Sequence, residues 1–187
     1  MRLNPHYGLT KQLAGTHALL SPSKPAWLNY DTDKLDRTYF NAQAAQRGTD
    51  EHAWAHESIR LKMRQIENSK AINQYVNDGI GFRMLCEFLL FFTENCYGHA
   101  DTFCFREDTL RIHDYKSGVG PTDMRQLEIY AALFCLEYGL RPFDIKIELR
   151  IYQGNQVKVH SPDSDDIFHI MDRIISFDRR LNELKGG

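Results

Sequence analysis

Two acidic residues and one lysine stand in this chain where their chemistry could be combined. Asp114 and Lys116 are two positions apart, so on a β-strand their side chains point to the same face. Asp101 closes the sequence Gly-His-Ala-Asp at residues 98–101, and a hairpin turn at residues 106–109 would fold the two strands back on each other. Carboxylates hold hard divalent cations through oxygen, and an amine stabilises negative charge on a phosphate. These residue types indicate metal-assisted hydrolysis of a phosphodiester.

Taken alone, the pair of Asp114 and Lys116 is weak evidence. At an average charged-residue content of about 25%, an acid-x-Lys triplet arises by chance about once in a chain of this size. The alternative interpretation is that both residues lie on the solvated face of an ordinary strand. The elements around them and the other motifs of the chain must decide between the two.

Strands are predicted on both sides of these residues. Apolar runs predict strands over residues 83–93, 98–106 and 109–116, and the first of them carries Glu87. Strict alternation predicts a further strand over residues 145–151, which a turn at Gly154 connects to a short strand through Val157 and Val159.

Helices are predicted before, between and after these strands. One covers residues 33–47 and ends at a break at Gly48, and the next begins near Thr49 or Asp50 with His56 on its inner face. A third runs from Pro121 or Thr122 to about Tyr138. A fourth follows an acidic first turn, and its buried stripe is expected to consist of Ile167, Ile170, Met171, Ile174 and Leu181.

This order predicts an α/β fold with a mixed central sheet flanked by helices. At 187 residues and 42% hydrophobic, the chain is long enough for one well-buried core, so we expect a single domain. Within it, residues 1–46 form an N-terminal wrapping segment, pinned by Trp27 and Leu28, and a helix. Residues 47–160 form the core, and residues 161–187 form the C-terminal helix.

Composition limits the class of protein. The net charge of -2 gives none of the overall basic character of many nucleic-acid binders. Any binding to DNA must therefore come from local basic patches and bound metal. The four cysteines form no Cys-x-x-Cys pair, and we recognise neither a signal peptide nor a long apolar run. We therefore expect a cytoplasmic, reduced protein without a membrane segment or a zinc site.

Four motifs occur in a fixed order along residues 47–152. They are Arg-Gly-Thr at residues 47–49 with Ala-His-Glu at residues 55–57, Gly-His-Ala-Asp at residues 98–101, Asp-Tyr-Lys-Ser-Gly at residues 114–118, and Gln126 with Tyr130. In this order, the chain resembles the PD-(D/E)XK nuclease superfamily, and within it the RecB-like exonucleases and their small stand-alone phage relatives. The resemblance implies a restriction-endonuclease-like αβββαβ core.

The same resemblance implies a set of site residues. Asp101 and Asp114 would be catalytic and would hold Mg²⁺ or Mn²⁺ together with His56 and the backbone carbonyl of Tyr115. Lys116 would orient or deprotonate the attacking water. Gln126 and Tyr130, one helical turn apart, would face the same way beside the site. Further candidates implied in this way are Glu87 and Ser117. Because no cysteine follows Cys135, the iron–sulfur cluster of some relatives is not expected.

The function expected from this resemblance is a metal-dependent DNA nuclease, specifically an exonuclease of phage or prophage recombination or repair. A structure-selective endonuclease and a non-catalytic DNA-binding module are the alternatives. DNA is the expected partner, with a recombinase or helicase and a homo-oligomeric state as further possibilities. His52 lies on the same helix face as His56, so either could be the histidine ligand. Because Mn²⁺ accepts imidazole more readily than Mg²⁺, we expect activity in Mn²⁺ to equal or exceed that in Mg²⁺.

Overall fold

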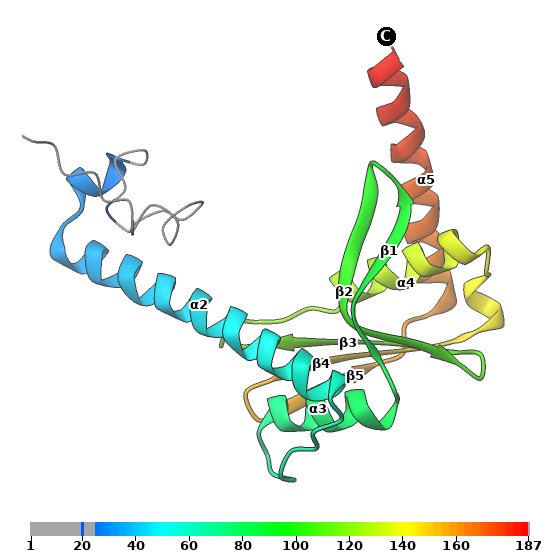
Figure 1. Cartoon of the computed structure of the whole chain (residues 1–187). Helices are drawn as coiled ribbons and strands as arrows, with labels where there is room; N and C mark the ends of the chain where they lie inside the picture. Colours follow the sequence, from blue (N-terminus) through cyan, green and yellow to red (C-terminus); the bar gives the residue numbers. More distant parts are fainter. Residues whose placement is uncertain (1–19, 21–24, 187) are drawn as a thin grey trace, which may run out of the picture. The chain divides into compact units, whose positions relative to one another are not determined.

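The computed structural model describes residue 20 and residues 25–186 (Figure 1). The chain divides into two compact units, with the boundary between Gln46 and Arg47. In the first unit, the 3₁₀-helix η1 (Pro25–Asn29) has no buried residue, and most of the predicted wrapping segment lies outside the described residues. The long helix α2 (Thr32–Arg60) begins in this unit and continues into the second, which carries the sheet.

The second unit is built on a five-stranded sheet with the strand order β1-β2-β3-β4-β5. The sheet is mixed, as predicted, because β3 and β4 are parallel and the other neighbours are antiparallel. A parallel pair requires a crossover, and helix α4 (Arg125–Tyr138) supplies it between β3 and β4. The strands are β1 (Leu85–Thr93), β2 (Cys96–Arg106), β3 (Thr109–Lys116), β4 (Lys146–Gln153) and β5 (Gln156–His160).

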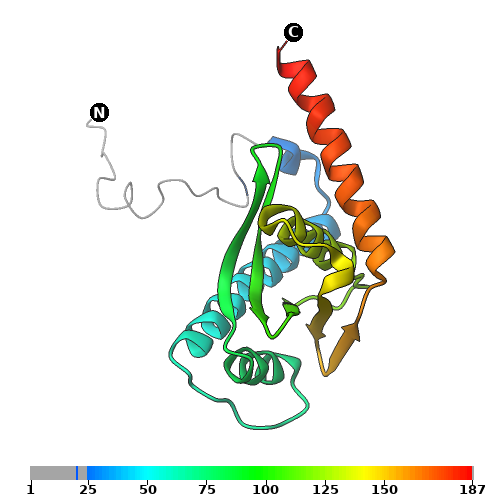
Figure 2. The same ribbon diagram turned by 90° about the vertical axis from the view of Figure 1, so that its right-hand side faces the viewer.

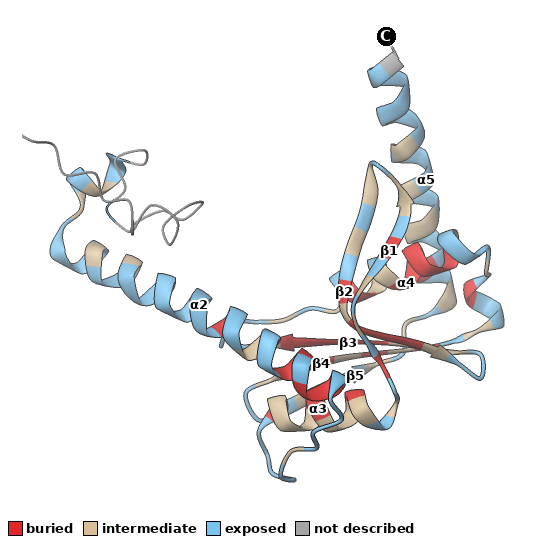
Figure 3. Ribbon diagram, in the orientation of Figure 1, coloured by how far each residue is buried: buried red, intermediate tan, exposed pale blue. Residues whose placement is uncertain are grey.

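Helices cover both faces of this sheet, and most of the buried residues lie between the layers (Figure 3). Leu110 and Ile112 of β3 pack on one face against α4 and α5 (Ser164–Gly186). Tyr115 of β3 and Tyr152 of β4 pack on the other face against α2 and α3 (Ala71–Gly81). This alternation along β3 follows from the two-residue period of a strand, and it confirms the α/β sandwich.

The predicted break at Gly48 is wrong, because α2 continues through it as one helix. A Cβ atom at this position would lie 2.6 Å from the Oγ atom of Ser117. The glycine therefore permits close approach of the helix to the residues that follow β3. A glycine in a helix costs only about 1 kcal/mol relative to alanine, which surrounding contacts can offset.

Helix α3 was not predicted from the sequence. Four of its eleven residues are Asn, Gln or Asp and two are Gly, and its buried surface consists of Ala71, Tyr75, Val76 and Gly79. These residues pack against Ala55 and Ile59 of α2, so the packing partner explains a helix that its own composition barely indicates. The C-terminal end of α4, by contrast, is set locally, by Gly139 in the left-handed conformation.

Helix α4 begins at Arg125, later than the predicted start at Pro121 or Thr122. The preceding residues form a loop, which the Nε2 atom of Gln153 holds by donating to the carbonyl oxygens of Gly118 and Gly120. In α5, Ile167 is buried as predicted, but Leu181 is 42% exposed. With 23 residues against the 14 of α4, α5 extends beyond the core that covers its first half.

The β1–β2 hairpin projects from the sheet as a long arm, and its tip lies beside α5 in both views (Figure 1, Figure 2). Thr93 Oγ1 and Asn95 Nδ2 donate to the Oδ1 atom of Asp178 at 2.6 and 2.8 Å, which fixes the tip to the helix. No helix in the described part of the chain is long and apolar enough to cross a membrane.

Candidate active site

The site lies where β2 separates from β3. The two strands pair from Arg106 with Thr109 as far as Thr102 with His113, and Asp101 and Asp114 are the next residues on the two strands. The Oδ2 atom of Asp101 accepts a hydrogen bond from the backbone N–H of Tyr115 at 3.4 Å. The two predicted carboxylates are therefore brought together at the point where the ladder between the strands ends.

Asp114 is buried, with 4% of its surface exposed, and Lys116 is its ion-pair partner. The Nζ atom of Lys116 lies 3.0 Å from Oδ1 and 2.9 Å from Oδ2 of this carboxylate. Burial chiefly, and then the negative charge of Asp101, raise the pKa of Asp114, while Lys116 lowers it, and the net result is a pKa of about 6. The chain thus keeps two mutually repelling carboxylates close together beside one amine.

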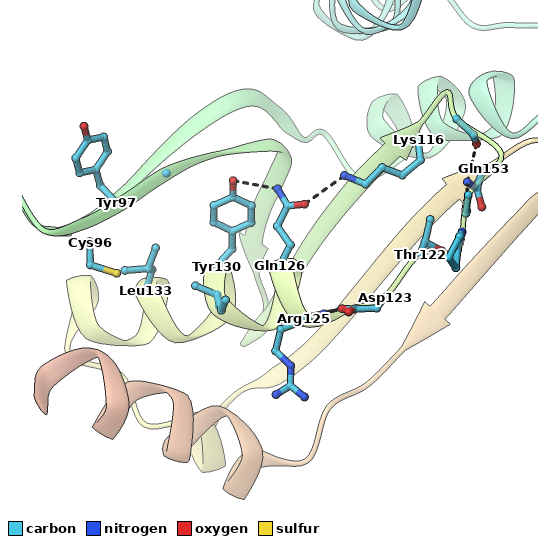
Figure 4. A pocket seen from close by; sticks show the side chains of 15 residues that line it. Cys96, Tyr97, Lys116, Thr122, Asp123, Arg125, Gln126, Tyr130, Leu133 and Gln153 are labelled. Atoms are coloured by element: carbon cyan, nitrogen blue, oxygen red, sulfur yellow. Dashed lines mark hydrogen bonds between the residues drawn. The ribbon is translucent and has the colours of Figure 1, made fainter. Parts of the chain in front are cut away.

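A chain of hydrogen bonds holds Lys116 from the side of α4 (Figure 4). The Nζ atom of Lys116 donates to Oε1 of Gln126 at 3.2 Å, and Nε2 of Gln126 donates to the hydroxyl of Tyr130 at 3.5 Å. That hydroxyl in turn donates to the carbonyl oxygen of His99 at 2.7 Å. Each of these hydrogen bonds restricts the orientation of the next side chain in the series. The prediction that Gln126 and Tyr130 face the same way is confirmed.

For the phosphodiester cleavage that the motifs lead us to expect, replacing Tyr130 with phenylalanine should lower the turnover number by about tenfold, on the order of one lost hydrogen bond. The variant removes the hydroxyl that orients Gln126 and joins α4 to β2, and it keeps the ring that packs over Gly98. Steady-state kinetics on a labelled oligonucleotide check this expectation. A change in KM with an unchanged turnover number would argue against a positioning role for Tyr130.

The two histidines of α2 have different surroundings. The Nδ1 atom of His52 lies 3.4 Å from Oδ2 of Asp101. His56 is buried, with Nδ1 3.4 Å from Oε1 of Glu87 and Nε2 3.2 Å from the hydroxyl of Tyr75. Burial lowers the pKa of His56, although the charges of Asp101 and Glu87 oppose this shift. Of the two, it is His52 that contacts a predicted catalytic carboxylate.

Glu87 occupies an unusual place in β1. Its neighbours Cys86 and Phe88 pair with Thr102 and Ala100, so Glu87 lies opposite Asp101, yet its backbone is left-handed with φ of 51°. Such a conformation in a residue other than glycine costs about 1–3 kcal/mol and is concentrated at functional sites. The side chain is 65% exposed and reaches His56, which makes it a peripheral member of the site.

Sequence reasoning missed one residue of this region, Glu51. Its Oε2 atom accepts a hydrogen bond from the hydroxyl of Tyr115 at 2.9 Å. Burial raises the pKa of Tyr115, and the neighbouring Glu51 raises it further, so the hydroxyl remains a donor. The contact ties α2 to the end of β3, as does the approach of Gly48 to Ser117, which is itself exposed. In the sequence, the only signal for a role of Glu51 at the site is its spacing from His52 and Ala55 on one helix.

The two carboxylates of the site are the ligand type that a hard divalent cation prefers. In the described residues no three His, Cys, Asp or Glu side chains form a group that could hold a metal ion. The oxygen donors are the carboxylates of Asp101 and Asp114. Burial chiefly, and the charge of Asp101 next, raise the pKa of Asp114, and a bound cation would favour its ionised form. The backbone carbonyl of Tyr115 and the imidazole of His52 are the further ligands at hand.

Comparison with known proteins finds no match to this chain among family models, curated proteins or solved structures. The resemblance to PD-(D/E)XK nucleases expected from the sequence rests on residue types and their order alone. The function proposed for the site therefore depends on its geometry and on this likeness.

Proposed function

We propose that this protein is a divalent-metal-dependent nuclease that hydrolyses phosphodiester bonds in DNA, and that within this class it is an exonuclease of phage or prophage recombination or repair. The observation that supports it most is the convergence of Asp101 and Asp114 at the end of the β2–β3 ladder, with the amine of Lys116 at 2.9 Å from Asp114. The exonuclease mode and the phage context are taken from the resemblance of the motifs.

In the proposed reaction, water adds across one phosphodiester bond. A bond forms between the water oxygen and phosphorus, the bond from phosphorus to one sugar oxygen breaks, and the proton of the water ends on that oxygen. Asp101, Asp114 and the carbonyl of Tyr115 would hold the cation, and a histidine of α2 would complete the set. When bound, the cation supplies charge neutralisation on the phosphate and lowers the pKa of the attacking water.

The residues of the chain position the other participants. Lys116 orients the attacking water and stabilises charge on the phosphate, since its amine is held between Asp114 and Gln126. Tyr130 acts through Gln126 and is a positioning residue. Asp101 accepts a hydrogen bond from the backbone N–H of Tyr115 and so joins the ends of β2 and β3.

Digestion of end-labelled linear DNA and of closed-circular DNA, each in Mn²⁺, Mg²⁺ or EDTA, tests the proposal. Metal-dependent loss of linear DNA alone supports an exonuclease, and cutting of the circle supports the endonuclease alternative. If neither substrate is cleaved in either metal while DNA is still bound, a non-catalytic DNA-binding module becomes the better account.

Activity in Mn²⁺ is expected to equal or exceed that in Mg²⁺ and to be much weaker in Ca²⁺, because a histidine among the ligands favours Mn²⁺. His52→Gln and His56→Gln form a matched pair of variants on one helix, and the ratio of rates in the two metals is the measurement. The variant of the ligating histidine should lose the preference for Mn²⁺. Activity in Mg²⁺ alone would argue against either histidine as a ligand.

A further inference from the structure

A pocket of about 700 Å³ opens beside Lys116, between α4, the start of β2 and the loop that follows β3. Pockets that take a single cofactor-sized molecule measure about 300–1,000 Å³. Lys116 and Gln126 line the end of the pocket at the candidate site, and Cys96, Ile129 and Leu133 give it an apolar part. Tyr130 lies between Gln126 and Leu133 (Figure 4).

The loop wall of this pocket is held in place by side-chain hydrogen bonds. Besides the two bonds from Gln153 to the loop carbonyls, Lys158 Nζ donates to Oγ1 of Thr122 at 2.9 Å. The carboxylate of Asp123 accepts a bond from the backbone N–H of Arg125 at the start of α4. A preformed wall needs little ordering when a ligand binds, which favours affinity.

We infer that this pocket receives one unpaired nucleotide, so that the substrate of the proposed nuclease is a DNA strand with a single-stranded end. The inference rests on the proposed function, which places the scissile phosphate at Lys116. A nucleotide extending from that phosphate then meets a surface that changes from polar at Gln126 to aromatic at Tyr130 and apolar at Ile129. A nucleotide changes in the same order, from its charged phosphate to its aromatic and less polar base.

Size and lining both suit one unpaired nucleotide. The volume lies in the range for a single small-molecule ligand, and the apolar and aromatic lining can pack against the face of a base only when that base is not stacked within a duplex. Lys116 and Arg125 line the pocket, while the one acidic group among its lining residues, Asp123, is bonded to backbone. Positive charge at the phosphate and an apolar, aromatic part beyond it are the features of single-strand binding sites.

The test uses Ile129→Asp with Ile175→Asp as its matched control. Both isoleucines are helical and 37% exposed, and Ile129 lines the pocket while Ile175 does not. Both substitutions add the same charge, so a difference in DNA binding between the two variants measures the contribution of the pocket. Ile129→Leu keeps the apolar surface and should behave as the unchanged protein.

Binding is measured with an oligonucleotide that carries the fluorescent base 2-aminopurine at its 5′ or 3′ terminus, in EDTA, as a single strand and as a blunt duplex. We expect single-strand binding at least tenfold tighter than duplex binding, and a loss of about ten- to hundredfold in Ile129→Asp, the size of one base stack. Equal binding of the two forms, or equal losses in Ile129→Asp and Ile175→Asp, would overturn the inference.

Hydrolysis of bis(p-nitrophenyl) phosphate, a phosphodiester without a base, separates this inference from the proposed function. If the unchanged protein hydrolyses it with metal and Ile129→Asp does so equally well, the catalytic proposal stands whatever the binding data show. If it is not hydrolysed but single-strand binding is lost in Ile129→Asp alone, the pocket stands and the catalytic proposal fails.

Discussion

Replacing Lys116 with alanine is expected to lower the rate of metal-dependent phosphodiester cleavage by about 10²–10⁴-fold, the range for a positioned acid–base group. The amine lies between Asp114 and Gln126 at the end of β3, where it meets the phosphate in the proposed complex. Cleavage of an end-labelled oligonucleotide under single-turnover conditions gives the rate. Binding of DNA should change far less than the rate.

Two further lysine variants control for charge and for folding. Lys146→Ala removes an exposed lysine from β4, the parallel neighbour of β3, and should leave the rate within about twofold of the unchanged protein, as for most surface substitutions. Lys116→Arg keeps the charge but replaces the compact ammonium with a planar group, so it should restore little activity. A Lys116→Ala protein that cleaves within tenfold of the unchanged rate would refute the catalytic assignment.

Asp114→Asn is expected to abolish cleavage and, in metal-free buffer at pH 8, to raise the stability of the fold by about 1–3 kcal/mol. In the folded protein the pKa of Asp114 is raised from 3.8 to about 6, chiefly by burial. The protonated carboxyl therefore contributes stability below pH 4, and this contribution is lost as the pH rises through about 6. Asparagine carries no charge at any pH and avoids that loss.

Thermal unfolding in EDTA at pH 5 and pH 8 measures this effect. The melting temperature of Asp114→Asn should exceed that of the unchanged protein by a few degrees at pH 8, and the difference should shrink at pH 5. Adding Mn²⁺ at pH 8 should stabilise the unchanged protein more than the variant, because a cation that binds only the folded state raises its stability. A difference in melting temperature that does not depend on pH would contradict the explanation by burial of a charge.

Local periodicity was sufficient to predict much of the sheet and part of the site. Asp114 and Lys116 do share a face of β3, and Gln126 and Tyr130 do lie on one side of α4, because both pairs follow the repeat of the element that carries them. The mixed central sheet also agrees with the order of helices and strands that the sequence predicts. The two side-chain pairs depend on residues that are neighbours in the chain.

Only the tertiary structure decided which distant residues meet. The spacing of His52 and His56 allows either to face the carboxylates, and the packing of α2 on β3 brings His52 to Asp101 and leaves His56 with Tyr75. The same packing explains Gly48, which is required by the approach of Ser117 and does not end the helix. A local pattern contains no information on such an approach between elements.

The left-handed backbone of Glu87 and the hydrogen bond from Tyr115 to Glu51 also depend on packing between distant residues. Each depends on how far β1 and α2 lie from the ends of β2 and β3, and those separations are set by the whole core. The sequence by itself therefore determined the types and the local order of the candidate catalytic groups. The tertiary structure decided their partners, because burial and distance between remote residues arise only when the layers pack together.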